Sequence, residues 1–471
     1  MERLSNQTHG GALLLTLCFA SPAGTPSGTD DSPVVAWERL LGRFADLFTR
    51  PSSGLFCTLI TGWALCPGRR TVTRMVDVAD PDGVHAHDAY HRFLREGKWD
   101  MTQLWCRLAP LLVSQLGSTL RLVLDLDDTL FHKAGRKVNG AGSFRDPIRS
   151  RGQRTVFAHG LNLVVLTLRI QPPWGGEPIG LPINMRRYRK RDGRSLLDLG
   201  QEMIEEVAGW LPDHSFILGC DGAYSSLAGR DLPRTHIVSR IQCNAALYEP
   251  APPRRPGQRG RPRKKGARLG TPVELATQAV DGWTMADIEV RGEQVERALW
   301  ARPLLWYAVR PLQQIMLVVV ADPGQREHDD LLFCTDLTIP PELVASLYAG
   351  RWSIEDTFRN TKQLLGGEQP QTWKAQGPER AAALSFWTYS AIWLWYLACH
   401  GDRPTWRRRP WYPAKRTPSF ADALAVLRRA LWCMNRFASS GEMADPCGLP
   451  RSRATRLPSS RCIGASSQRC T

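Results

Sequence analysis

Short apolar runs that alternate with an amphipathic segment, from residue 120 onward, constrain the fold of this chain most strongly. The runs at 120–130 (LRLVLDLDDTL), 161–170 (LNLVVLTLRI) and 214–226 (HSFILGCDGAYSS) predict strands buried on both faces. Between the second and third runs, residues 195–211 repeat apolar side chains at three- and four-residue steps, which predicts a helix. This alternation favours an α/β fold with a mixed or parallel sheet, whose ligands lie at the carboxyl ends of the strands.

Acidic residues occupy the ends of two predicted strands. Asp128 stands near the end of the first strand, and Asp221 follows the apolar part of the third. A further carboxylate, Glu355, lies on a long helix that we expect to open at Pro341 and to run to about Leu365. These three acids are therefore candidates for one shared site.

Four side chains of that helix fall within one narrow stripe, because their spacings of three, four and seven residues match a rotation of about 100° per residue. The four are Tyr348, Arg351, Glu355 and Lys362. The stripe has two interpretations. It is either a solvated face with an Arg351–Glu355 ion pair worth a few tenths of a kcal/mol, or a functional face with two cations and a carboxylate.

The chain is strongly basic, with 61 Lys and Arg against 45 Asp and Glu and a formal net charge of +16. This surplus favours a polyanionic partner, most often nucleic acid and next an anionic membrane surface. Much of it lies at 252–269 (PPRRPGQRGRPRKKGARL), a Pro- and Gly-rich run that either enters an A·T minor groove like an AT-hook or contacts phosphates as a disordered loop. Its DNA-binding candidates are Arg259, Arg261, Arg263, Lys264 and Lys265.

The segment at 348–366 (YAGRWSIEDTFRNTKQLLG) has the spacing Y-(2)-R-(3)-E-(6)-K. It resembles the Tyr-Arg-Glu-Lys signature of one large group of bacterial insertion-sequence transposases of the DDE type. The resemblance covers roughly residues 36–435. It implies a ribonuclease H-like catalytic core, as in the retroviral-integrase superfamily. It also implies that Asp128 (in D-L-D-D-T), Asp221 (in LGCDGAY) and Glu355 are the catalytic and metal-binding acids.

The same resemblance implies that Arg351, Lys362 and Tyr348 contact DNA phosphates. Lys133, five residues after the first acid, is expected to point toward a phosphate as well. Trp352 either stacks on a base displaced near the cut end or packs in the core.

The implied activity is the cutting and rejoining of DNA at the ends of an insertion sequence. Water attacks the phosphodiester first, and the freed 3′-hydroxyl then attacks target DNA. Two divalent ions about 4 Å apart can activate the nucleophile and stabilise the leaving oxygen. Mg²⁺, for which Mn²⁺ can substitute, prefers carboxylate oxygens. The expected partners are the element ends and target DNA, held by a homodimer, without a nucleotide cofactor.

The long gap from Asp221 to Glu355 implies a β-rich insertion at about 245–335, which contains the basic run. The N-terminal helical region fits plain scaffold as well as DNA binding. The predicted organisation is a disordered extension at 1–35, a helical DNA-binding domain at 36–118, a ribonuclease H-like catalytic domain at 119–400, a helical C-terminal segment at 401–438 and a disordered tail at 439–471.

Two alternatives to an active transposase stay open. The first strand also resembles the D-x-D-x-T motif of haloacid-dehalogenase-type phosphatases, in which Asp125 would be the nucleophile and Asp127 the general acid. That interpretation leaves the helix stripe and the basic run unexplained. The other alternative is a catalytically inactive DNA-binding protein derived from a transposase.

One segment, 381–399 (AAALSFWTYSAIWLWYLAC), has nearly transmembrane length. Its polar and aromatic content and its isolation favour a buried core helix, so no membrane partner is expected. The short apolar run at 11–20 has only a weak positive flank for a secretory signal, because Glu2 offsets Arg3. We therefore expect a cytoplasmic bacterial protein that associates with the nucleoid when bound to DNA.

Overall fold

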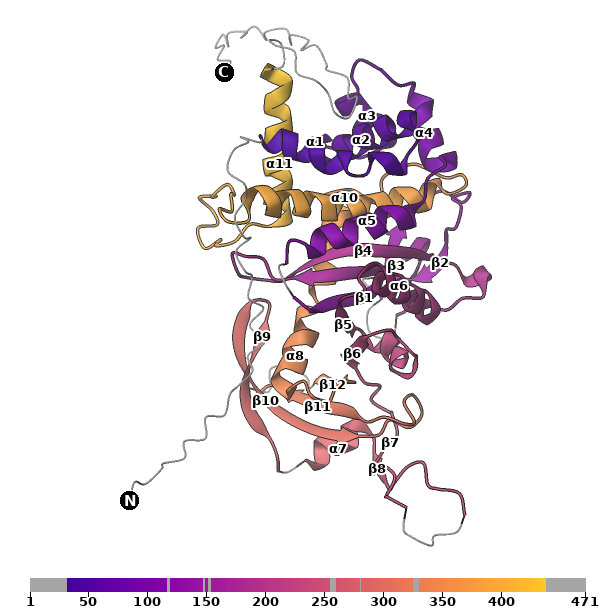
Figure 1. Cartoon of the computed structure of the whole chain (residues 1–471), viewed down its shortest axis with the longest axis vertical. Helices are drawn as coiled ribbons and strands as arrows, with labels where there is room; N and C mark the ends of the chain where they lie inside the picture. The colour runs from indigo at the N-terminus through magenta and orange to yellow at the C-terminus, as the bar shows by residue number, and fades with distance from the viewer. Residues whose placement is uncertain are drawn as a thin grey trace, which may run out of the picture.

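A large mixed sheet with helices gathered toward one end makes up the fold (Figure 1). The computed structural model of the chain describes residues 32–116, 119–146, 149–150, 154–254, 260–279, 281–324 and 330–437. The strands are β1 (Arg121–His132), β2 (Gly142–Arg145), β3 (Phe157–Ile170), β4 (Ile179–Tyr188), β5 (Ser215–Cys220), β6 (Thr235–Arg240), β7 (Leu247–Tyr248), β8 (Arg268–Gly270), β9 (Thr284–Val290), β10 (Glu293–Leu304), β11 (Ile315–Ala321) and β12 (Asp330–Cys334).

The helices of the described residues lie before, within and after this sheet in the chain. The α-helices are α1 (Pro33–Gly42), α2 (Arg50–Leu65), α3 (Val72–Ala79), α4 (His87–Glu96), α5 (Met101–Val113), α6 (Leu196–Trp210), α7 (Pro272–Gln278), α8 (Pro341–Gly350), α9 (Ser353–Gln363), α10 (Gly377–His400) and α11 (Phe420–Phe437). Short 3-10 helices are η1 (Ala45–Leu47), η2 (Lys190–Asp192) and η3 (Gly222–Gly229).

The centre of the sheet has the ribonuclease H-like arrangement. Among the described residues, ten strands form one sheet in the order β2-β3-β1-β5-β6-β12-β11-β10-β9, with β4 also beside β3. β3 runs antiparallel to β1 and β4, whereas β1, β5 and β6 are parallel to one another. The predicted mixed α/β class and ribonuclease H-like core are confirmed.

The β-rich insertion extends this sheet instead of standing apart from it. β12 pairs antiparallel with β6, with Cys334 opposite Val238, and β11, β10 and β9 follow in order. α8 covers these strands, because its Val344 and Ala345 share a buried cluster with Val318 of β11. Figure 1 shows the β7–β8 hairpin, which carries the basic run, projecting beyond this half of the molecule. These β-rich residues lie between β6 and α8, and the bounds of about 245–335 for an insertion stay a prediction.

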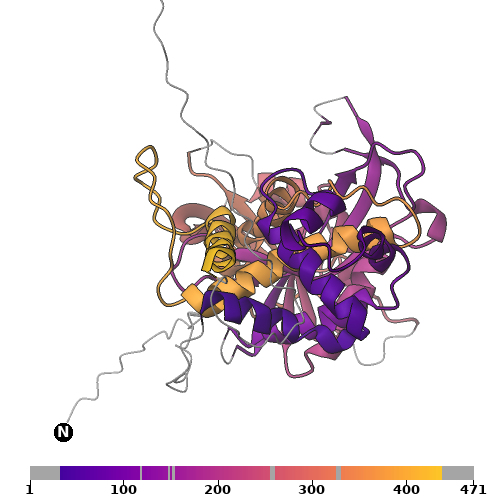
Figure 2. The same cartoon turned by 90° about the horizontal axis from the view of Figure 1, so that it is seen from above.

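Helices from both ends of the chain share one core over the other half of the sheet (Figures 1 and 2). Trp387 of α10 meets the rings of Phe44 and Phe56 edge-on, at centroid distances of 4.9 and 5.2 Å. Arg428 of α11 donates from Nε to the carbonyl of Ala64 at the end of α2, at 2.7 Å. The first and last helices of the described chain therefore pack as one layer.

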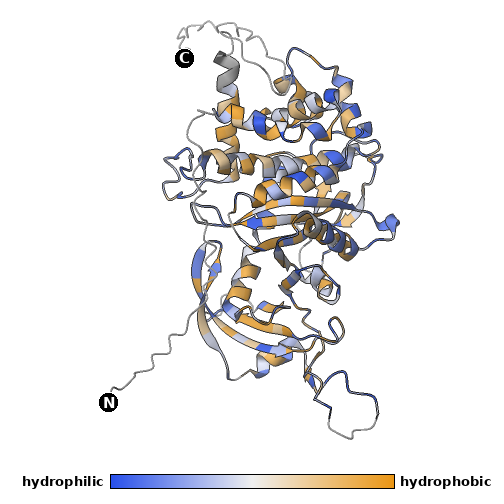
Figure 3. Cartoon of the chain, viewed as in Figure 1, coloured by the Kyte–Doolittle hydropathy of each residue, from blue (hydrophilic) through white to orange (hydrophobic). Residues whose placement is uncertain are grey.

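The segment predicted as a buried core helix is α10. Its side chains are buried almost continuously from Gly377 to Tyr396. Figure 3 shows apolar residues along α10 and along the central strands. Within the described residues, no helix is both long enough and apolar enough to cross a membrane. The predicted extension at 1–35 lies outside the described residues except for its last four, and the tail at 439–471 lies outside them entirely.

Two elements differ from the sequence prediction. The sequence does not predict β4, because Pro182 and Asn184 have low strand propensity. Among the described strands β4 pairs only with β3, and the register shifts next to Pro182, so the missing amide hydrogen is tolerated at an edge bulge. The single helix predicted from Pro341 to Leu365 is two helices, α8 and α9, joined by a turn at Arg351 and Trp352.

Candidate active site

The register of the central strands brings acidic residues together. In the parallel pair of β1 and β5, Leu126 lies opposite Cys220, so Asp127 and Asp221 follow as the next residues on adjacent strands. Because side chains alternate along a strand, Asp127 shares a face of the sheet with Asp125, and Asp128 points to the opposite face. The two neighbouring aspartates of β1 therefore have different surroundings.

Arg351, at the joint between α8 and α9, connects Asp127 to Glu355. Its Nη1 donates to Asp127 Oδ2 at 3.2 Å, and its Nη2 donates to Glu355 Oε1 at 3.0 Å. Arg351 is 8% exposed, and Glu355 lies in the first turn of α9. The acid of β1 that shares a partner with Glu355 is thus Asp127.

Asp128 has other partners. It accepts a hydrogen bond from Tyr224 Oη of η3 at 3.0 Å, and Asn162 of β3 also bonds to it. Asp221 caps η3, since its Oδ1 accepts from the Ala223 amide at 2.5 Å. The sequence predicts Asp128 as the acid of the first strand, whereas the geometry sets Asp127 beside Arg351 and holds Asp128 by a tyrosine and an asparagine.

The charges of the site are unbalanced among the residues described. Burial raises the pKa of Asp127 to about 7, with further raising by Asp128 and Asp221 and an opposing effect of Arg351. Burial likewise raises the pKa of Asp128. For Arg351, burial lowers the pKa, but the charges around it, Asp127 foremost, outweigh burial and raise the pKa above its ordinary value. A single guanidinium therefore faces several carboxyl groups that destabilise one another's ionised forms.

This donor set fits a divalent cation in its chemistry. Among the residues that the structure describes, no three Asp, Glu, His or Cys side chains come close enough together to hold a metal ion. The pKa of Asp127 is raised mainly by burial and further by neighbouring carboxylates, so added positive charge would stabilise its ionised form. Asp127, Asp221 and Glu355 would supply the oxygens, and Arg351 would have to leave the space between Asp127 and Glu355.

Asp125 has a structural position. It is fully buried and forms an ion pair with Arg169 of β3, whose Nε donates to Oδ2 at 2.9 Å. Arg169 also donates from Nη1 to the carbonyl of Leu347 at 2.7 Å, and Ser353 Oγ lies 3.3 Å from Asp125 Oδ2. This pair fixes the α8–α9 joint to the sheet. A nucleophile must reach its substrate, so the buried, paired Asp125 does not suit the phosphatase alternative.

Gly219 of β5 makes room for that ion pair, and its replacement gives a first prediction. A Cβ at Gly219 would lie 2.5 Å from Asp125 Oδ1 and 3.0 Å from Arg169 Nη2. Gly219→Ala is therefore expected to lower the free energy of unfolding by about 1–3 kcal/mol, as measured by urea denaturation. The matched control is Gly209→Ala on the exposed side of α6, where a Cβ meets nothing within 4 Å. Equal stability of the two variants would contradict a tight fit at Gly219.

The four residues of the predicted stripe do not share a single helix. Tyr348 stays with Arg351, whose guanidinium carbon lies 5.6 Å from the centre of its ring. Lys362 lies two turns along α9 from Glu355, with its amine 5.8 Å from the ring centre of Phe131 in β1. Tyr348, Arg351 and Glu355 are therefore close together at the joint. Lys362 lies apart from them, beside the end of β1.

Two other predicted DNA contacts, Lys133 and Trp352, have different surroundings. Lys133 donates to the carbonyls of Glu368 and Pro370 at 2.7 and 3.4 Å, and burial lowers its pKa to about 8. Trp352 is 42% exposed, with the guanidinium carbon of Arg291 at 4.9 Å from a ring of its indole. Lys133 is thus engaged within the protein, whereas Trp352 reaches the surface.

The basic run is carried by the projecting β7–β8 hairpin. Its Lys265 lies over the rings of Tyr248 and Tyr307, at 3.7 and 4.7 Å. Arg259 is outside the described residues. Of the other DNA-binding candidates in the run, Arg261, Arg263 and Lys264 are exposed.

A family model matches more than half of the chain. The model is that of a DDE superfamily endonuclease, and the match covers residues 43–302. It contains β1, β5 and the acids Asp127, Asp128 and Asp221, and it ends before Glu355. No curated protein matches the chain.

Proposed function

The chain belongs to the DDE superfamily endonuclease family, and from this premise we propose that it is a transposase of the Tyr-Arg-Glu-Lys group. It cuts DNA at the ends of its own insertion sequence and joins the freed 3′ ends to target DNA, acting as a homodimer. The observation that carries the proposal is the bridge from Asp127 through Arg351 to Glu355, next to Asp221 at the centre of the sheet.

In this proposal Asp127, Asp221 and Glu355 hold divalent ions, Mg²⁺ or Mn²⁺. Support for Asp127 over the Asp128 predicted from sequence comes from the shared partner of Asp127 and Glu355, and from the tyrosine that already binds Asp128. The ions would activate the attacking oxygen and stabilise the leaving one. Asp128 adds negative charge to the site from the opposite face of β1.

Arg351 changes partners during binding. A guanidinium that is planar and always charged can exchange a carboxylate for a phosphate of similar geometry. Tyr348, stacked near it, limits the directions in which it can move. A DNA phosphate would then become the partner of Arg351, and Asp127 and Glu355, freed from the guanidinium, would be available to hold the ions.

The test of function uses the purified full chain and a supercoiled plasmid that carries the DNA flanking its gene. Cleavage at defined ends is expected with Mg²⁺ or Mn²⁺, and its complete loss with EDTA. A second plasmid then reports joining of the released ends. Tight DNA binding without cleavage in any metal would establish the inactive DNA-binding alternative instead.

Removal of the bridging cation gives a prediction about metal binding itself. Arg351→Met is expected to tighten Mn²⁺ binding by about tenfold, because an ion no longer competes with a guanidinium about 3 Å from two carboxylates. Isothermal titration calorimetry without DNA measures this affinity. The matched control is Arg359→Met, which removes an exposed cation of α9 that pairs with Asp356. It should leave the Mn²⁺ affinity unchanged. Weaker metal binding in Arg351→Met would contradict the exchange of partners.

A further inference from the structure

An arm of residues 403–416 connects α10 to α11 and projects from the body in both views (Figures 1 and 2). Its beginning is fixed because Tyr396 Oη donates to the Thr405 carbonyl at 2.7 Å and accepts from the Thr405 amide at 2.9 Å. Its end is fixed because Lys415 pairs with Asp422, which also accepts from the Ser419 amide at 2.9 Å. The arm is therefore an anchored projection.

Positive charge accumulates on the free part of the arm. Residues 403–416 contain five Arg and one Lys and no acid. Arg407, Arg408 and Arg409 are exposed in succession, and within the described residues none of them forms an ion pair with a carboxylate. Three adjacent guanidinium groups without a counter-charge favour an anionic partner.

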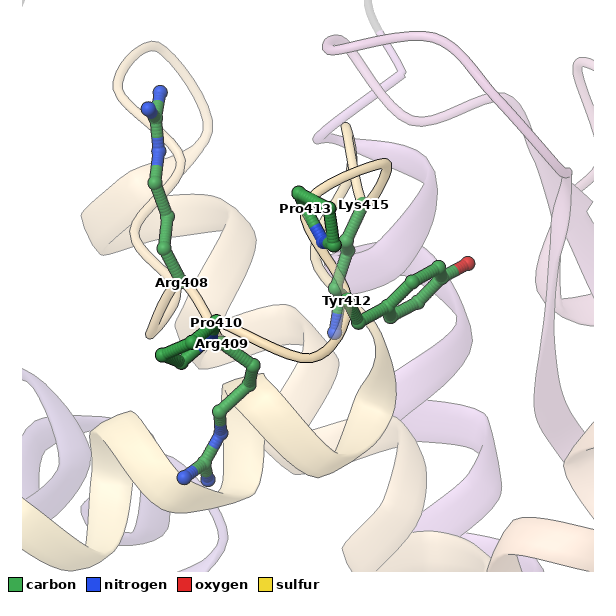
Figure 4. A pocket seen from close by; sticks show the side chains of 6 residues that line it. All are labelled: Arg408, Arg409, Pro410, Tyr412, Pro413 and Lys415. Carbon is green, nitrogen blue, oxygen red and sulfur yellow. The ribbon is translucent and has the colours of Figure 1, made fainter.

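The turn of the arm also exposes two large aromatic side chains. Trp411 is 77% exposed and Tyr412 55%. The turn is closed by an antiparallel bridge between Arg409 and Tyr412, and the Arg409 guanidinium carbon lies 5.4 Å from a ring of Trp411. Figure 4 shows the residues that line a hollow in the arm, with the side chains of Arg408 and Tyr412 pointing away from each other. Neighbouring exposed aromatic rings on this turn favour a binding surface.

A series of close contacts joins the base of the arm to the candidate active site. A Cβ at Gly176, in the β3–β4 loop, would lie 3.1 Å from Thr417 Cγ2, and the backbone of Gly176 meets Gly292 in the β9–β10 turn. Arg291, the residue before Gly292, stacks on Trp352, which directly follows the bridging Arg351. The base of the arm is thus connected to the α8–α9 joint through the β3–β4 loop and the β9–β10 turn.

We propose that this arm binds the DNA strand that flanks the cleavage site, with its arginines on phosphates and Trp411 stacked on an unpaired base. The inference rests on the proposed function for the identity of the strand. Arginine and exposed aromatic rings without acidic residues suit single-stranded nucleic acid, because phosphates pair with guanidinium groups and every base has a face that can stack. Trp352 and its Arg291 would lie between the arm and the cut end.

The experiment measures DNA affinity by fluorescence anisotropy, using the full chain with Glu355→Gln and no divalent metal. Each variant is titrated against a duplex with a single-stranded extension and against the same duplex with blunt ends. Trp411→Ala is expected to weaken binding of the extended duplex by about tenfold and to leave the blunt duplex nearly unchanged. The combined change of Arg407, Arg408 and Arg409 to Ala should reduce the slope of log affinity against log salt by about two.

Controls separate the arm from the fold and from the proposed function. Trp432→Ala removes a tryptophan of α11 that is 48% exposed and should bind both duplexes like the parent. Thermal unfolding shows whether each variant is folded. If the parent binds DNA and the arm variants bind equally well, the arm proposal alone fails. Equal losses on both duplexes for Trp411→Ala would overturn the stacking role, and a parent that binds no DNA would overturn both proposals.

Discussion

Asp127→Asn is expected to abolish DNA cleavage, with a fall in rate of at least about a thousandfold, whereas Asp128→Asn should keep measurable activity. The substitution removes one negative oxygen and keeps the shape of the side chain. Asp127 is joined through Arg351 to Glu355, and it lies next to Asp221 because the two residues follow the paired Leu126 and Cys220 on adjacent strands. Asp128 lies on the opposite face with Tyr224. Loss of charge should therefore matter far more at Asp127.

The measurement is the initial rate of metal-dependent nicking of the plasmid, with DNA affinity recorded in parallel. Asp221→Asn and Glu355→Gln should resemble Asp127→Asn, with DNA binding retained in all three. The reverse pattern, in which Asp128→Asn is dead and Asp127→Asn is active, would assign the first carboxylate to the position predicted from sequence. An active Glu355→Gln would reject the proposed site altogether.

Arg169→Met is expected to lower the free energy of unfolding by about 3–5 kcal/mol, because it leaves the buried Asp125 carboxylate without its cation. The side chain of Arg169 is 8% exposed and that of Asp125 is 0% exposed. The substitution also removes the bond to the Leu347 carbonyl that fixes the end of α8. Urea denaturation at neutral pH measures the change.

Two further variants identify the cause of that loss. Asp125→Leu combined with Arg169→Met removes both charges and should recover most of the lost stability, since a buried pair is often replaceable by apolar side chains. Arg92→Ala breaks an exposed pair with Asp88, whose side chains are 57% and 67% exposed, and should cost less than about 1 kcal/mol. If the double variant were no more stable than Arg169→Met, the cost would lie in packing and not in the unpaired charge.

The sequence predicts the central strands and α10 well because burial on all sides leaves continuous apolar runs. It does not predict β4, whose Pro182 sits at an edge bulge that local propensity disfavours. It also treats residues 341–365 as one helix, because Gly350 alone does not mark the turn at Arg351 and Trp352. The contacts on either side of that turn, from Arg169 to the Leu347 carbonyl and from Ser353 to Asp125, come from strands distant in the sequence.

The candidate site is predictable in its residue types and less so in its contacts. Asp221 follows its strand as expected, and Glu355 lies on a helix as expected. The choice between Asp127 and Asp128 depends on which face of β1 meets α9, and that is decided by register with strands many residues away. Lys133 cannot be placed from sequence, because its partners are backbone carbonyls more than two hundred residues along the chain.

The shared core of the first and last helices has a consequence for how the chain is made. α1 leaves the ribosome early, yet the helices that cover its apolar face are α10 and α11, which also cover part of α2. This apolar surface therefore stays exposed until nearly the whole chain has been synthesised. Exposed apolar surface favours aggregation of the nascent chain. A chain that ends before α10 should not leave an intact N-terminal module, and the helices at its start complete their folding among the last.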